Sequence, residues 1–283
     1  MVVRRAAALV LLAGVLAGCG ASPPPAAQPS SAQPPVPAAP TSAPAEDTEE
    51  TALPVYYVAE TPAGYRLQRE FHRVASEDPP TDAVREMLAS PTGTDPDYRN
   101  PWPPGVAVRA PVEHEGDVIT VDLTGFGPAA VEPALGELAV QQLVFTVQGA
   151  LQSTDPVQIL VDGSAVDALW GVRTASPVPR GDAYDLRSLV QIDAPAHGTT
   201  VGRDVEVSGE AAVFEATLLW EVLRDGTVVR SGVASTAEGQ RFAPYTFDVA
   251  LEPGVYTVRV MEDDPSGGEG RPPLVDDKTI TVG

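Results

Sequence analysis

The chain has 283 residues, 43% of them hydrophobic, so it is long enough for two ordinary domains that each bury a core. Its formal net charge is −21, with 39 Asp and Glu against 18 Lys and Arg. Because nucleic acid is a polyanion that requires a basic surface, this charge argues against nucleic-acid binding, and we interpret it mainly as a source of solubility.

The start of the chain has the three parts of a lipoprotein export signal. Arg4 and Arg5 precede a short apolar run at 6–15, and the sequence Leu-Ala-Gly-Cys then ends at Cys19. The apolar run is too short to span a bilayer comfortably, so we predict a cleaved signal peptide over residues 1–18. The only cysteine stands where a thiol receives diacylglycerol, with the freed amine open to acylation by a fatty acid such as palmitate. We therefore predict a lipoprotein anchored through Cys19 to the outer face of the cytoplasmic membrane.

Residues 19–52 are rich in Ala, Pro, Ser and Thr and contain almost no large apolar side chain. Such a segment cannot bury enough surface to offset the entropy of ordering, and proline favours extended conformations. We predict a lipidated, disordered tether that holds the folded part away from the membrane.

Residues 53–175 alternate between strand and helix patterns. Strands are predicted at 55–58, 65–74, 106–108, 118–123 and 157–161, and helices from 78–81 to about 89 and at 137–151. The second helix is the strongest, because its apolar side chains recur at i, i+3, i+4 and i+7. The order β-β-α-β-β-α-β predicts a mixed-sheet α+β sandwich, with a Pro-rich loop at 92–105.

The remainder of the chain has an all-β pattern. After a polar linker at 176–187, residues 188–283 form short apolar runs between frequent turn signals, including a hairpin turn at 225–226. We expect Trp220 to fill the centre between two sheets and Tyr256 to occupy the position of a corner tyrosine. The pattern predicts an immunoglobulin-like β-sandwich.

The first domain resembles a known family. The motifs are Gly-Asp-Val-Ile-Thr-Val-Asp-Leu at 116–123, the helix sequence at 137–147, Val-Gln-Ile-Leu-Val-Asp-Gly at 157–163 and Leu-Trp-Gly at 169–171. Their order and spacing resemble the sporulation and spore germination (GerMN) domain over most of residues 53–175.

The second domain resembles a different known family. Ile-Asp-Ala-Pro at 192–195 leads to Val-Glu-Val-Ser-Gly-Glu-Ala at 205–211 and Val-Phe-Glu-Ala at 213–216. This resembles the immunoglobulin-like domain of bacterial spore germination proteins over nearly all of residues 188–283. The resemblances imply two modules that occur together in one polypeptide. Both families also occur in bacteria that make no spores, so neither implies germination.

No catalytic motif stands out in the sequence. His72, His114 and His197 fall on separate predicted elements, and we interpret each as a surface or satisfied histidine. The sequence has no Gly-x-Ser-x-Gly, His-Glu-x-x-His or phosphate loop, and an acylated Cys19 leaves no Cys/His metal set. Lys278, the only lysine, is attributed to composition bias. We predict a protein that is not an enzyme and has no cofactor or metal.

Acidic residues cluster around a Gly-rich loop near the C-terminus. They are Glu262, Asp263, Asp264, Asp276 and Asp277. Carboxylate oxygens suit calcium, but the Asp-x-Asp-x-Asp-Gly register is absent. A solvated acidic loop is therefore favoured, and calcium binding stays open as the alternative.

Tyr98 and Trp102 are the candidate partner-binding residues. Exposed aromatic side chains in a Pro-rich loop can anchor a glycan or a protein. The alternative is that Trp102 folds back onto its own helix.

These features predict an extracytoplasmic scaffolding lipoprotein whose modules bind another envelope protein or cell-wall material. The alternative is a peptidoglycan- or small-ligand-binding sensor or accessory lipoprotein, for which we expect an aromatic-lined pocket around Trp102 and Tyr98. An enzyme would require acidic residues that converge in a cleft with a perturbed pKa. The sequence does not decide the oligomeric state.

Overall fold

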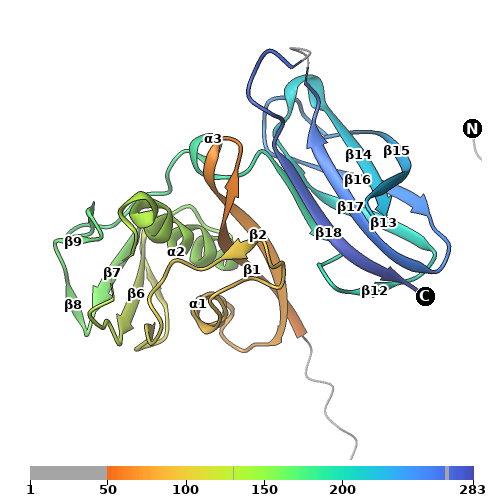
Figure 1. Ribbon diagram of the computed structural model, residues 1–283. Coiled ribbons are helices and arrows are strands. Elements are labelled where there is room, and N and C mark those ends of the chain that lie inside the picture. Colours follow the sequence, from red (N-terminus) through yellow and green to blue (C-terminus); the bar gives the residue numbers. More distant parts are fainter. Residues whose placement is uncertain (1–49, 130, 265–267) are drawn as a thin grey trace, which may run out of the picture. The chain divides into compact units, whose positions relative to one another are not determined.

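The computed structural model describes residues 50–129, 131–264 and 268–283 (Figure 1). Strands predominate over helices throughout these ranges. None of the helices found there combines the length and hydrophobicity that a membrane-spanning helix requires.

The N-terminal module extends from the first described strand to the linker before residue 188. Its elements are β1 (Glu50–Thr61), β2 (Gly64–Ala75), α1 (Pro79–Ala89), β3 (Tyr98–Arg99), β4 (Ala107–Val108), β5 (Glu113–Glu115), β6 (Val118–Thr124), η1 (Pro133–Leu135), α2 (Gly136–Leu151), β7 (Val157–Val161), β8 (Ser164–Ala165), β9 (Ala168–Leu169), β10 (Val172–Arg173) and α3 (Ala183–Leu186).

The strands of this module form two main sheets around a core that includes both long helices. One sheet has the order β2-β1-β3, and the other has the order β4-β6-β7-β8, with β5 also paired to β6. The second sheet is mixed, because β6 pairs in parallel with β7 and antiparallel with β4. Helix α2 packs against β1 and α1 and is buried along most of its length. The predicted α+β fold is confirmed.

The first strand begins earlier than its apolar residues indicate. Its pairing with β2 runs from Glu50 opposite Ala75 to Thr61 opposite Gly64. Residues 50–52, which we assigned to the tether, therefore lie in β1. Their side chains carry no apolar alternation, and β2 supplies the hydrogen-bonding partner that extends the strand.

The C-terminal module contains strands and one short helix. Its elements are β11 (Val190–Ala194), β12 (Thr200–Val201), β13 (Asp204–Ala211), η2 (Phe214–Ala216), β14 (Thr217–Arg224), β15 (Thr227–Ser235), β16 (Ala243–Ala250), β17 (Gly254–Glu262) and β18 (Val275–Val282).

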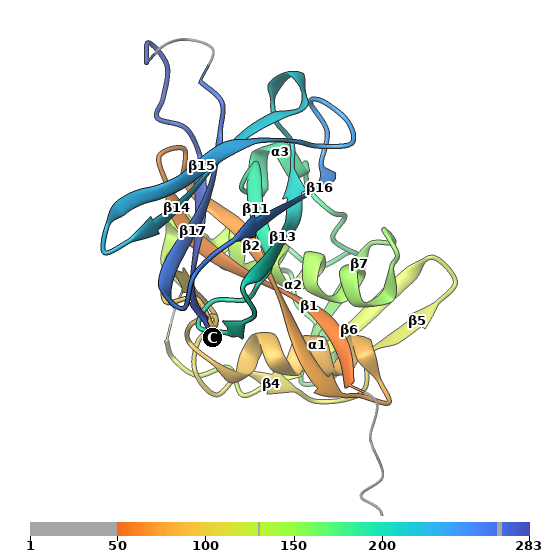
Figure 2. The same cartoon turned by 90° about the vertical axis from the view of Figure 1, so that its right-hand side faces the viewer.

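Two sheets enclose the core of this module. One sheet has the order β12-β18-β17-β14-β15, and the other has the order β11-β13-β16. Figure 2 labels β14, β15 and β17 of the first sheet and β11, β13 and β16 of the second. Trp220 of the first sheet packs against the core and stacks on Phe247 of the second, with ring centroids 4.7 Å apart. The hydroxyl of Tyr256 donates to the Glu252 carbonyl at 2.9 Å, as a corner tyrosine does. The predicted immunoglobulin-like sandwich is confirmed.

Gly209 lies in the middle strand of the smaller sheet, opposite Tyr245. A Cβ there would lie 1.9 Å from the Gln191 carbonyl oxygen and 2.7 Å from the Tyr245 hydroxyl, which itself donates to that carbonyl. We expect Gly209→Ala to lower the free energy of unfolding by about 1–3 kcal/mol, because backbone must move to admit the methyl group. Chemical denaturation measures this.

Gly202→Ala is the matched control, because no atom lies within 4 Å of the added Cβ. We expect it to leave stability unchanged or to raise it by less than about 1 kcal/mol. Equal effects of the two substitutions would contradict the steric explanation.

Candidate functional site

The two modules make direct contact through β2 and β11. The carbonyl of Leu67 accepts from the backbone N–H of Ser188 at 2.9 Å and from the side-chain amide of Gln191 at 3.2 Å. A backbone group of the N-terminal module is therefore satisfied by the chain that enters the C-terminal module.

An arginine-centred ion-pair network lies beside this contact. The guanidinium of Arg69 in β2 donates to both carboxylate oxygens of Asp193, at 3.1 and 2.6 Å, and lies 3.4 Å from Glu210. Arg187 also donates to Glu210, at 2.8 Å. The two-pronged pair between Arg69 and Asp193 fixes both position and angle.

A second network surrounds Lys278, whose side chain is 2% exposed. Its ammonium donates to Asp95 at 2.7 Å, to the Tyr98 hydroxyl at 2.6 Å and to Asp276 at 3.1 Å. An ammonium has three N–H donors, so each has one partner. Asp95 and Tyr98 belong to the N-terminal module, and the other two residues to β18.

The charges of this cluster stabilise one another. Burial by itself lowers the pKa of Lys278, but the charges of Asp276 and Asp95 outweigh it, and the pKa lies above its usual value. Burial raises the pKa of Asp276, partly offset by the charge of Lys278. Burial and the charge of Asp276 hold the pKa of Tyr98 well above its usual value.

The perturbed carboxyl group of Asp276 is fully engaged within the protein. Its Oδ1 accepts from Tyr98 and Lys278, and its Oδ2 accepts from the backbone N–H of Ile192 at 2.6 Å. A general acid or base must instead reach a proton on a substrate. The cluster therefore has the geometry of a structural junction between modules.

A cavity of about 570 Å³ adjoins this cluster, and we call it the acidic groove. Its lining comes from the end of β1, from β2, from the loop before β3 and from the start of β18: Ala59, Glu60, Thr61, Pro62, Gln68, Asp95, Pro96, Asp97, Tyr98, Val275, Asp276 and Asp277. Five of these residues carry carboxyl groups and none is basic. The groove therefore favours positive charge.

Both aromatic candidates from the sequence are buried. Trp102 is 5% exposed, its indole N–H donates to the Ala139 carbonyl at 2.9 Å, and its ring meets Trp170 edge-on at 4.8 Å. Tyr98 is 2% exposed and points its hydroxyl at Asp276. Of the two alternatives for Trp102, the structure has the one in which it folds back onto a helix, and that helix is α2 rather than α1, which precedes its loop.

The cavity that Tyr98 lines, the acidic groove, is not the expected aromatic-lined pocket, because Tyr98 is the only aromatic residue in its lining and Trp102 does not line it. A buried ring offers almost no surface to a partner. Trp102 is therefore better explained by packing, and the hydroxyl of Tyr98 contributes to the module junction.

The three histidines contact different carboxylates. His114 contacts Asp155 at 2.7 Å, and His197 lies 3.6 Å from Asp95. His72 contacts Glu70 at 3.2 Å and Glu86 at 2.9 Å, so its interpretation as a satisfied histidine is confirmed.

His72 should make stability depend on pH. Burial lowers its pKa, but the hydrogen bonds to Glu70 and Glu86 outweigh burial and hold the pKa above its usual value. A raised folded-state pKa gives stability that is fully present below about pH 6.5, the unfolded value, and is lost as pH rises through the folded value. We expect His72→Asn to lower the melting temperature more at pH 6 than at pH 9. A deficit that stays equal at both pH values would contradict this.

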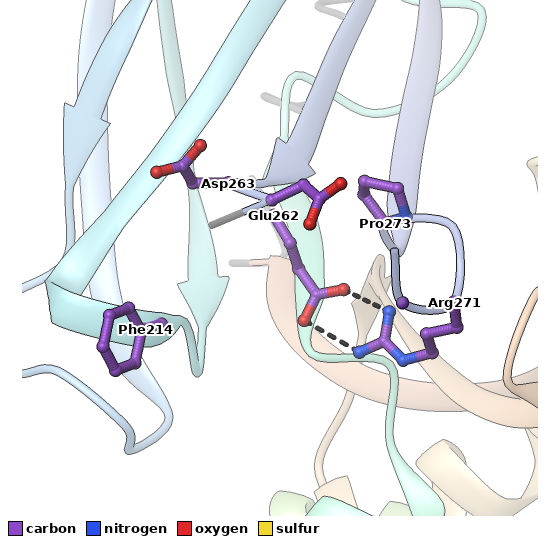
Figure 3. Close-up of a pocket in the computed structure, with 7 residues that line it drawn as sticks. Phe214, Glu262, Asp263, Arg271 and Pro273 are labelled. Carbon is purple, nitrogen blue, oxygen red and sulfur yellow. Dashed lines mark hydrogen bonds and ion pairs between the residues drawn. The ribbon is translucent and has the colours of Figure 1, made fainter. Parts of the chain in front are cut away.

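The carboxylates near the C-terminus do not come together on one centre. Figure 3 shows Glu262 paired with Arg271, whose guanidinium lies 2.6 Å away, in a cavity that Phe214 also lines. Asp276 points instead into the Lys278 cluster, and Asp277 lies 3.4 Å from Arg259. Within the described ranges, no three His, Cys, Asp or Glu side chains converge as metal ligands. The geometry therefore favours the solvated acidic loop over calcium binding. Cys19 lies outside the described residues.

Two family models match the chain. Residues 54–167 match the model described as sporulation and spore germination (Germane). Residues 189–269 match the immunoglobulin-like domain of bacterial spore germination (Gmad2). Neither description names a catalytic activity. No curated protein matches the sequence.

Two solved structures show a distant similarity. The tandem GerMN domains of the sporulation protein GerM from Bacillus subtilis are 18% identical, with a TM-score of 0.37 over 50% of this chain. This chain spans 50% of that structure's length. A Clostridium perfringens protein described as a lipoprotein is 13% identical, with a TM-score of 0.33 over 52% of this chain and 98% of that one. The N-terminal module therefore matches the Germane family model, and the C-terminal module matches the Gmad2 immunoglobulin-like model, each over part of the chain.

Proposed function

We propose that this chain is a lipid-anchored scaffolding protein of the bacterial envelope, whose two modules act as one binding body outside the cytoplasmic membrane. The main supporting observation is that buried charged side chains form ion pairs between the two modules. Lys278 and Arg69 pair with carboxylates of the opposite module, at 2.7 and 2.6 Å. These groups couple the modules and leave no free nucleophile or base among themselves.

A rigid pair of modules suits scaffolding. Fixing the two modules beforehand lowers the entropy that a partner must offset when it contacts both of them. An anchor at Cys19 would add a high local concentration near the membrane. The sequence up to Cys19 supports this anchor, with its two arginines, short apolar run and lipobox.

The anchor is tested by metabolic labelling with an alkyne analogue of palmitate, followed by mass spectrometry of the mature N-terminus. We expect a labelled wild type that begins at Cys19 and partitions into detergent. Cys19→Ala should lose the label, and Ser22→Ala, just beyond the lipobox, should keep it. A labelled Cys19→Ala variant, or a mature wild type without lipid, would refute the anchor.

The scaffolding role is tested by crosslinking intact cells and purifying the chain with whatever it contacts. We expect the wild type to recover one protein or cell-wall fragment reproducibly, and Cys19→Ala to recover much less. Failure of the wild type to recover any partner, together with turnover of a wall substrate by the purified chain, would refute the role.

A further inference from the structure

The lining of the acidic groove includes a buried hydrogen-bond acceptor that has no donor within the described residues. Gln68 is 2% exposed and lines the groove. Its side-chain carbonyl oxygen is buried and accepts no hydrogen bond from any part of the chain that the structure describes. Buried acceptors are almost always satisfied, so this oxygen requires a donor that the described chain does not supply, either a water molecule or a group of a ligand.

The rim of the groove carries uncompensated negative charge. Glu60 and Asp97 are exposed, and neither has an ion-pair partner within the described ranges. Asp277, in contrast, is paired with Arg259, whose guanidinium lies 3.4 Å away, so it adds little net charge. The ammonium of Lys278 lies beneath the groove, where it is shared between two carboxylates. A cation that enters the groove therefore meets net negative charge.

The walls of the groove also include small apolar surfaces. Ala59, Pro62, Pro96 and Val275 line it together with the acidic groups. Lysine and arginine side chains combine an alkyl stem with a charged head that donates several hydrogen bonds. Such a side chain matches the apolar walls with its stem, the acidic rim with its charge and the Gln68 carbonyl with an N–H.

We infer that the acidic groove is a binding site for a basic side chain, arginine or lysine, presented by the protein partner of this chain. The inference rests on the proposed scaffolding function and names the chemistry by which the partner is recognised. The volume of about 570 Å³ accommodates one such side chain with the backbone that carries it.

The site is tested with the full chain by NMR titration, following the side-chain amide of Gln68. The probes are N-acetyl-arginine amide, N-acetyl-lysine amide and N-acetyl-citrulline amide, which is a neutral analogue of the arginine probe. We expect saturable shifts of the Gln68 amide with at least one basic probe and none with citrulline. Equal shifts with citrulline, or no saturable shift with either basic probe, would overturn the inference.

A matched pair of variants separates the groove from the general acidity of the protein. Glu60→Gln/Asp97→Asn removes two charges at the rim and should weaken binding about fivefold or more. Asp204→Asn/Glu206→Gln removes two exposed charges on β13 and should change it less than about twofold. Gln68→Leu should weaken binding while it keeps or raises the melting temperature, because it removes a buried unpaired acceptor. Equal weakening by the two double variants would overturn the inference.

Capture from crosslinked cells distinguishes this inference from the proposed function. If the wild type recovers a partner and Glu60→Gln/Asp97→Asn recovers it equally well, the scaffolding role stands and the groove assignment is wrong. If the wild type recovers no partner, the scaffolding role fails, and the titration alone decides whether the groove binds a basic side chain.

Discussion

Replacing Lys278 with methionine should lower the free energy of unfolding by about 3–5 kcal/mol, the usual cost of removing one partner from a buried ion pair. The loss leaves Asp95 and Asp276 buried and close together without the ammonium, and the basic group that stays near them is His197, 3.6 Å from Asp95. Chemical denaturation at pH 7 measures the effect. Arg241→Met is the matched control, because Arg241 is 79% exposed and lies 3.9 Å from Glu238. It should change stability by less than about 0.5 kcal/mol.

The deficit of Lys278→Met should also depend on pH. Without the ammonium, the pKa of Asp276 rises further, because its charged form loses the partner that offsets burial. A raised folded-state pKa favours folding at low pH and loses that contribution as pH rises. The deficit should therefore be smaller at pH 5 than at pH 8, and Asp276→Asn in the same chain should recover part of it. A constant deficit across this range would show that packing, and not charge, is responsible.

The fold was largely predictable because its signals are local. The apolar stripe of α2 and the run at 118–123 depend on the spacing of residues within a single element. The corner position of Tyr256 depends only on a turn just before it. Local signals alone predicted a start of β1 that lies too far along the chain. Residues 50–52 belong to the strand only because they pair with β2.

The junction and the acidic groove could not be predicted in this way. Lys278 and Asp95 are separated by 183 positions, and neither carries a local pattern that indicates burial. One signal was present, since a chain that otherwise uses arginine keeps a single lysine at position 278. A compact ammonium with three donors fits three converging oxygens, whereas the planar guanidinium of arginine does not.

A second large effect on stability is expected at Trp102, which is buried. Trp102→Ala should lower the free energy of unfolding by about 3–5 kcal/mol, because it empties a site between α2, Trp170 and Phe126. Trp102→Phe keeps a six-membered ring but loses the hydrogen bond to Ala139 and part of the packed volume, so we expect a smaller loss, of about 1–2 kcal/mol. Denaturant titration of both variants measures the difference.

Phe214→Ala provides the control for an aromatic side chain that is truly at the surface. Phe214 is 50% exposed, and its truncation should change stability by less than about 0.5 kcal/mol. If Trp102 instead anchored a partner, Trp102→Ala would keep wild-type stability and lose capture of that partner from crosslinked cells. The expected result is the opposite: reduced stability, with capture retained at temperatures where the variant is folded, because the indole N–H already has its acceptor inside the protein.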